Sequence, residues 1–217
     1  MLVSLVALAG CTSSGKPHAD KSTSPSPSPT TYTAPPDAFP VPGSDVTLST
    51  STDTGSWGPP ALTNPTQTAA YVAAAGLPYN EEMLQVHYHA HLDVIINGKP
   101  ATVPPYVGFV VQGKKVAGLA PLHTHDNSGI IHIENSVPAT FVLGQFFVEW
   151  GVRLSATCVG GYCADATHEL AVFVNGNRSA GDPNQIVLHK HDEIAIEYGA
   201  KGKLPKPPSS YVFQNGL

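Results

Sequence analysis

Three histidines and an aspartate alternate with other residues in the segment VHYHAHLDVIING, which spans residues 86–98. In a β-strand, successive side chains point to opposite faces, so three histidines and an aspartate share one face. These residues are His87, His89, His91 and Asp93. Neutral imidazole is a ligand for zinc, copper, nickel and iron, and this spacing lets neighbouring rings reach one ion. The pattern therefore predicts one wall of a metal site.

A second group of histidines lies in the segment LHTHDNSGIIHIE, residues 122–134. It contains a His-x-His pair followed by an aspartate, and then a strand with a histidine and a glutamate on one face. These residues are His123, His125, Asp126, His132 and Glu134. We expect this group to supply the second wall of the metal site. The alternatives are an exposed polar strand face and buried histidines that only form hydrogen bonds.

The composition limits which metal and which chemistry this site would support. Only two methionines occur, Met1 and Met83, so ligation of Cu(I) by thioethers is unsupported and Zn(II) or Cu(II) is expected. An open coordination position would let bound water act as a nucleophile, with Asp93, Asp126 or Glu134 as the base. A metal-dependent hydrolase or oxidoreductase is thus an alternative to metal uptake, buffering or delivery. A module that binds protein or glycan without metal is a third possibility.

The first eleven residues, MLVSLVALAGC, are apolar but too short to span a bilayer. Their last four residues, LAGC, resemble a bacterial lipobox, in which the signal is removed before the cysteine and the cysteine is lipidated. The resemblance implies a signal peptide over residues 1–11 and lipidation of Cys11. It also implies an extracytoplasmic protein that is anchored to the bacterial membrane. The alternative is an ordinary buried N-terminal strand.

Composition separates a linker from a folded domain. Residues 12–65 are rich in Ser, Thr and Pro and predict a disordered linker, whereas residues 66–217 predict a single domain. Cys158 and Cys163 in CVGGYC predict a disulfide in an oxidising compartment, with metal binding as the alternative. The net charge of −5, without a dense basic patch, argues against a nucleic-acid partner.

Cap signals and periodicity predict two short helices in this domain. Asn64 and Pro65 are typical of a helix start, and Gly76 is typical of a helix end. A second helix is predicted by apolar residues at helical spacing, followed by a glycine stop. These residues are Leu143, Phe146, Phe147, Trp150 and Gly151. We expect this helix to pack its aromatic stripe on a sheet.

Two Asn-Gly dipeptides, at residues 97–98 and 175–176, predict hairpin turns. Two strands, a helix, VFVNG and the closing HDEIAIEYG together resemble the β-grasp pattern of ubiquitin-like sulfur carriers over residues 129–200. The resemblance implies a fold and no activity, because the chain continues past Gly199 instead of ending in Gly-Gly. The expected fold class is therefore α+β and β-rich. It comprises a β-grasp-like core with an N-terminal His-bearing β-hairpin and two short helices.

The strings HYHAHLDVIINGK and LHTHDNSGIIHIE also resemble a group of uncharacterised secreted proteins and lipoproteins from actinobacteria and some archaea. This similarity covers most of Val86 to Gly199 and implies an extracytoplasmic protein without a transferable activity. His189 and His191 are expected to be polar residues of a turn. We therefore expect an extracytoplasmic lipoprotein that binds a transition metal through clustered histidines. The expected ligands are His87, His89, His91, His123, His125 and His132.

Overall fold

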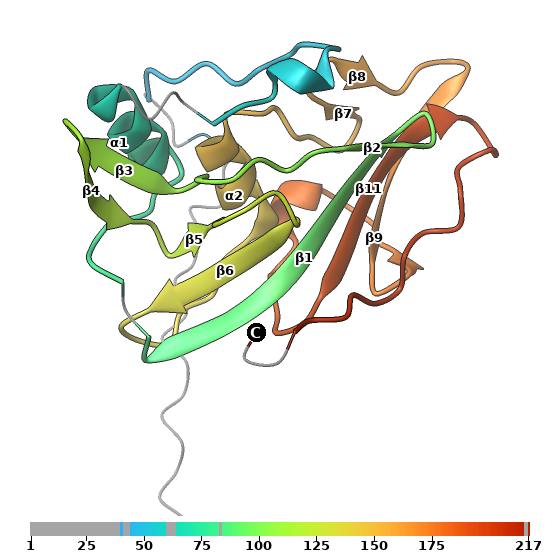
Figure 1. The fold of residues 1–217 in the computed structure, drawn as a ribbon. Coiled ribbons are helices and arrows are strands. Elements are labelled where there is room, and N and C mark those ends of the chain that lie inside the picture. Colours follow the sequence, from blue (N-terminus) through green and yellow to red (C-terminus); the bar gives the residue numbers. More distant parts are fainter. Residues whose placement is uncertain (1–39, 41–43, 60–63, 83, 215–216) are drawn as a thin grey trace, which may run out of the picture.

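The computed structural model has a β-rich, α+β architecture built around a mixed sheet (Figure 1). This coarse class agrees with the sequence prediction. The expected signal peptide, Cys11 and residues 12–39 of the expected linker lie outside the described residues. The structure describes residues 40, 44–59, 64–82, 84–214 and 217.

Within these residues, the helices are short and most of the regular structure is extended. The helices are η1 (Thr54–Ser56), α1 (Pro65–Ala74), α2 (Leu143–Trp150) and η2 (Pro183–Gln185), where η marks a 3-10 helix. The strands are β1 (Val86–Ile96), β2 (Lys99–Ala101), β3 (Phe109–Gln112), β4 (Lys115–Leu119), β5 (Leu122–His123), β6 (Ile130–Asn135), β7 (Cys158–Val159), β8 (Tyr162–Cys163), β9 (His168–Val174), β10 (Asn177–Arg178) and β11 (Glu193–Ala200).

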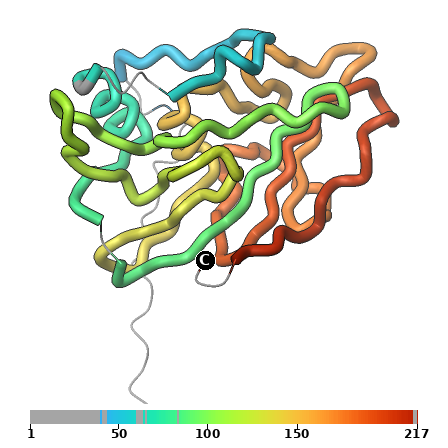
Figure 2. The backbone as a smooth tube through the Cα atoms, viewed as in Figure 1, coloured from blue at the N-terminus to red at the C-terminus, as the bar shows by residue number. Residues whose placement is uncertain are grey.

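The long strand β1 joins the two halves of the main sheet, as the backbone trace shows (Figure 2). In the described chain this sheet has the order β10-β9-β11-β1-β6-β5, and β2 pairs with β1 outside that path. The first half of β1 pairs antiparallel with β6, and its second half pairs parallel with β11. The histidines of β1 are therefore shared between two different neighbouring strands.

One face of the sheet packs against α2 and forms the hydrophobic core. Ala90, Leu92 and Val94 of β1 are each at most 1% exposed, because they alternate with the polar positions of the strand. The aromatic stripe of α2 faces them, and each such buried side chain contributes roughly 1.5–3 kcal/mol. Gly151 ends α2 in the left-handed conformation, with φ of 75°, which confirms the predicted stop.

The predicted linker extends too far into the folded part of the chain. Residues 44–59 lie against the domain, so the prediction of a disordered linker is wrong for this stretch. Trp57 is only 2% exposed, packs edge-on against Trp150 at a centroid distance of 6.1 Å, and donates to the carbonyl of Ser51. Burying this large aromatic side chain offsets part of the entropy lost by ordering a polar segment.

The local turn predictions are confirmed. Asn97 and Gly98 adopt positive φ angles of 51° and 75° between β1 and β2, as a tight hairpin turn requires. Cys158 and Cys163 form a disulfide between β7 and β8. The described helices include none with the length and apolar character needed to cross a bilayer. The β-grasp resemblance stays a prediction.

Candidate metal centre

Strand register brings the two predicted histidine groups together on one face of the sheet. β6 lies between β5 and β1, and His132 of β6 is directly opposite His123 of β5 and His89 of β1. These three imidazoles thus form a row across three strands. Glu134 is opposite His87 in the next same-face row, so the carboxylate lies beside the same imidazoles.

His125 joins the cluster from beyond the end of β5. Thr124 between the two histidines points the other way, donates to the carbonyl of Pro104 and is fully buried. This anchor leaves His123 and His125 on the same side, with their Nε2 atoms 3.2 Å apart. The centroid of the His125 ring lies 4.5 Å from that of His132. The His-x-His spacing is therefore used here as the sequence predicted.

The donor atoms of five imidazoles and one carboxylate crowd together. The Nε2 atom of His89 lies 3.0 Å from Nε2 of His87 and 3.1 Å from Nδ1 of His132. The Oε1 atom of Glu134 lies 3.3 Å from His87, 3.6 Å from His132 and 3.8 Å from His123. Nε2 of His89 has two imidazole nitrogens as neighbours, and one nitrogen cannot donate to one of them and accept from the other at the same time. Simple hydrogen-bonded pairs therefore do not account for this cluster.

The spacing of these atoms matches a coordination shell. Donors bound tetrahedrally to zinc at about 2.0–2.1 Å lie roughly 3.3–3.4 Å from one another, which is close to the distances in the cluster. His123, His125, His132 and Glu134 each offer a donor atom, and all four atoms lie within 4.8 Å of one another. These residues could hold a metal ion through three imidazoles and a carboxylate.

Burial favours the neutral form that metals require in three of the imidazoles, those of His89, His123 and His125. Burial lowers the pKa of His123 to about 4, against a smaller opposing effect of the Ala120 carbonyl. Burial, followed by the neighbouring His132 and His87, lowers the pKa of His89 to about 4. Burial and His132 likewise lower the pKa of His125. Ligand-competent imidazole therefore predominates at neutral pH.

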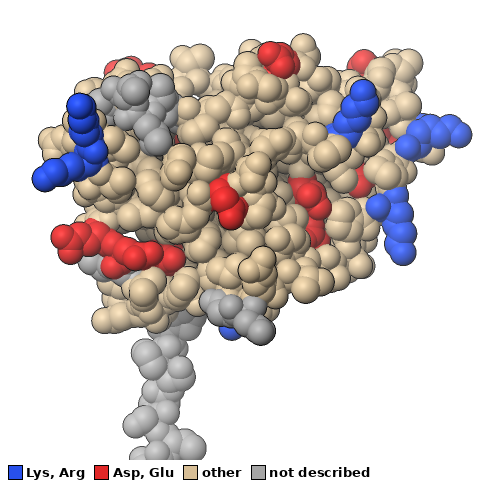
Figure 3. Space-filling view, viewed as in Figure 1, with Lys and Arg blue, Asp and Glu red and all other residues tan. Residues whose placement is uncertain are grey.

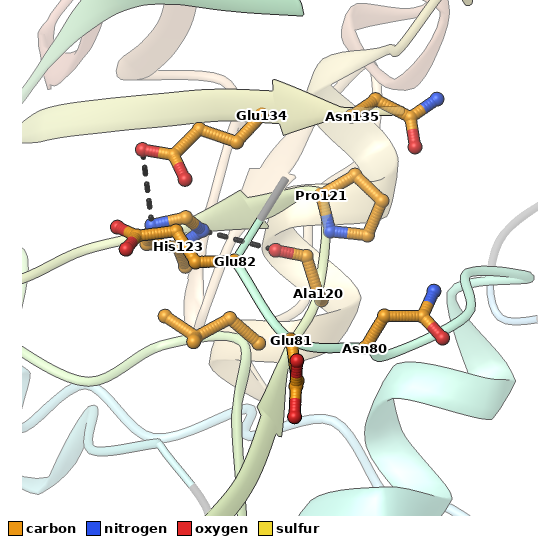
Figure 4. A pocket seen from close by; sticks show the side chains of 9 residues that line it. Asn80, Glu81, Glu82, Ala120, Pro121, His123, Glu134 and Asn135 are labelled. Atoms are coloured by element: carbon orange, nitrogen blue, oxygen red, sulfur yellow. Dashed lines mark hydrogen bonds and ion pairs between the residues drawn. The ribbon is translucent and has the colours of Figure 1, made fainter. Parts of the chain in front are cut away.

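A backbone contact orients one of the clustered imidazoles. Nδ1 of His123 lies 3.0 Å from the carbonyl oxygen of Ala120. Because a carbonyl only accepts, Nδ1 carries the proton and Nε2 presents its lone pair to the cluster. Figure 4 shows this contact together with the approach of Glu134 from the other side. Such an outer contact is typical of metal-bound histidine.

Two buried polar atoms of the cluster have no hydrogen-bond partner among the described residues. They are Oε2 of Glu134 and Nδ1 of His89. Burial, which raises the pKa of Glu134, is outweighed by the His132 contact and the nearby imidazoles, so the pKa is lowered. An unpartnered buried carboxylate oxygen costs free energy, and coordination to a cation would offset that cost.

His91 lies outside this cluster, although the sequence prediction included it. Its Nδ1 contacts Oε2 of Glu193 and its Nε2 contacts the carbonyl of Ser128, both at 2.8 Å. The ring of Tyr211 stacks on it at a centroid distance of 3.8 Å. Burial opposes the positive charge, but Glu193 and Ser128 raise the pKa of His91 above its ordinary value. Both ring nitrogens are therefore occupied by protein contacts.

The three predicted base residues have different surroundings. Glu134 lies in the cluster, whereas Asp93 forms a separate donor set with His91 and Glu193 on the other half of β1. The carboxylate of Asp126 accepts from the backbone N–H of Ser128 at 2.8 Å, which makes it a turn residue at the edge of the site. Of the three, Glu134 is the one that approaches the imidazoles of His87, His123 and His132 within 3.8 Å.

A small cavity beside the cluster is lined in part by two acidic residues, Glu81 and Glu82, that the sequence analysis did not single out. It has a volume of about 20 Å³, and its lining includes Glu81, Glu82, His123 and Glu134 (Figure 4). Acidic side chains also gather on this side of the surface, near the segment that connects α1 to β1 (Figure 3). Their negative potential favours the approach of cations. No periodicity of the segment NEEML marked these residues in advance.

Comparison with known proteins gives no relative to draw on. The chain matches no protein-family model, no curated protein and no solved structure. The functional argument therefore depends on the side chains themselves.

Proposed function

We propose that this protein binds a transition metal ion, Zn(II) or Cu(II), through His123, His125, His132 and Glu134. One observation carries the proposal: four donor atoms from β5, β6 and the adjoining loop lie within 4.8 Å of one another. Imidazole with carboxylate suits either ion. Uptake, buffering or delivery of the ion is the role that such a site serves.

Retention of metal by the purified protein is the direct test. The full chain, without a histidine tag, is analysed by native mass spectrometry before chelation, after chelation, and after re-addition of zinc or copper. We expect a specifically bound ion that the His125→Ala variant holds more weakly. His168→Ala is the matched control, because His168 is a half-exposed histidine at the far end of β9. A protein that takes up no specific ion contradicts the proposal.

We further propose that the protein acts outside the cytoplasm on a lipid anchor. Two features support this: the LAGC sequence that ends at Cys11, and the disulfide between Cys158 and Cys163, which is typical of an oxidising compartment. Metabolic labelling with a fatty-acid analogue should tag the wild type and leave Cys11→Ala untagged. Label that persists in the variant contradicts lipidation of this cysteine.

A metal-dependent hydrolase is the second candidate, and the cavity beside the cluster favours it. Its volume of about 20 Å³ is enough for about one water molecule next to His123 and Glu134. Glu82 lines the same cavity and is placed to accept a proton from that water. A bound ion would supply Lewis acidity. The zinc-loaded protein should then hydrolyse activated esters or phosphodiesters, and Glu82→Gln should lose this activity while it retains zinc. The absence of turnover by the wild type would exclude those substrates.

A further inference from the structure

His87 and His89 are not explained by the four-donor set, although their ring nitrogens face the same cluster. They form a second set of donors together with His132, and the three atoms of this set also lie within 4.8 Å of one another. The two sets therefore share His132 alone. The pairing of β1 with β6 fixes the register of the second set, and the pairing of β5 with β6 places His123 opposite His132 in the first.

A single ion does not account for both sets. Two donor atoms that each lie about 2.1 Å from one ion are at most roughly 4.2 Å apart. If one ion bound all six donor residues of the cluster, their donor atoms would therefore form a single set within 4.8 Å. The six donors instead separate into a set of four and a set of three. The cluster is thus wider than one coordination shell along the direction from His125 to His87.

We propose that the cluster holds two transition metal ions side by side, the second on His87 and His89, with Glu134 bridging the two ions. His132 stays with the first ion, because one imidazole nitrogen has a single lone pair. This inference rests on the proposed function, because the first ion occupies the four-donor set. Oε1 of Glu134 lies 3.3 Å from Nε2 of His87 and 3.8 Å from Nε2 of His123, so this carboxylate is placed between the two ions. Its buried, unpartnered Oε2 gives it a second oxygen for bridging.

The two positions differ in how closed they are. The four-donor set includes the fully buried His123 and completes a tetrahedral shell from protein groups alone, as in structural sites. The second ion has three protein ligands, His87, His89 and the bridging Glu134, which leaves a position open. The His87 side chain that lines this position is 34% exposed to solvent. The second ion is therefore the exchangeable one, and it is the position from which an ion is delivered or at which a substrate binds.

Stoichiometry and magnetic coupling test this inference in the full chain. Zinc titration with native mass spectrometry should give two bound ions for the wild type and for His168→Ala, but one for His87→Ala. Copper(II) loaded at two equivalents should show a coupled electron paramagnetic resonance spectrum, since ions about 3.5–4 Å apart interact magnetically. His87→Ala should give the uncoupled spectrum of one ion. Circular dichroism checks that the variant is folded.

Each outcome separates the two proposals. One tightly held ion in the wild type, without coupling, overturns the second ion and leaves the proposed function in place. Two ions that both persist in His87→Ala overturn the assignment to this residue set. No specific ion overturns both proposals together. The wild-type stoichiometry and spectrum decide the inference even if the His87 variant does not fold.

Discussion

Removal of one exposed ligand offers the sharpest test of the four-donor set. His125 is exposed, so His125→Ala leaves the core intact, while zinc binding loses one of four protein ligands. A binding free energy of about 10 kcal/mol, the low end for structural zinc, corresponds to a Kd of about 0.05 μM. At about 10 μM free zinc, the native state is then stabilised by about 3 kcal/mol. For a domain of this size, that raises Tm by roughly 6–12 °C.

An equal share per ligand assigns about 2.5 kcal/mol to His125, which weakens binding roughly 70-fold. The zinc-dependent stabilisation of His125→Ala then falls to about 0.9 kcal/mol, or a Tm shift of roughly 2–4 °C. Thermal melts with zinc and with chelator measure this difference, and His168→Ala should keep the full wild-type shift. An unchanged zinc shift in His125→Ala, or an equal loss in the control, would refute the reasoning.

Three further predictions concern parts of the fold around the site. Glu149 is fully buried without a hydrogen-bond partner among the described residues, and burial raises its pKa; the native state therefore keeps a proton that the unfolded chain loses, so stability falls as pH rises above the ordinary carboxyl range. Urea unfolding at several pH values measures this loss. Between the ordinary carboxyl range and neutral pH, the free energy of unfolding should fall less for Glu149→Gln than for the wild type, by about 1–3 kcal/mol. Gly129 has φ of 86°, and a Cβ there would lie 2.6 Å from the carbonyl oxygen of Leu92. In thermal melts, Gly129→Ala should therefore lower Tm more than the control Gly113→Ala, whose Cβ meets nothing within 4 Å. Tyr211→Ala should lose about 0.5–1.5 kcal/mol of stacking and speed amide exchange in the C-terminal segment.

Local sequence patterns predicted the pieces of the site well. Period-two alternation in β1 placed His87 and His89 on the polar face, and the Asn97-Gly98 turn ended that strand as expected. These features follow from interactions between near neighbours in the chain. The same patterns failed for residues 44–59, where Ser, Thr and Pro suggested disorder and the buried Trp57 outweighed that composition.

The division of the histidines required information that local patterns do not contain. His91 has the same spacing as His87 and His89, and no periodicity separates it from them. It differs because its part of β1 pairs with β11, which brings Glu193 into contact from 102 residues away. On its other side, His91 is opposite Ile130 of β6, whose side chain offers no donor atom. The boundary of the histidine cluster therefore lies where β11 begins to pair with β1, and strand register rather than composition determines which donor atoms each histidine faces.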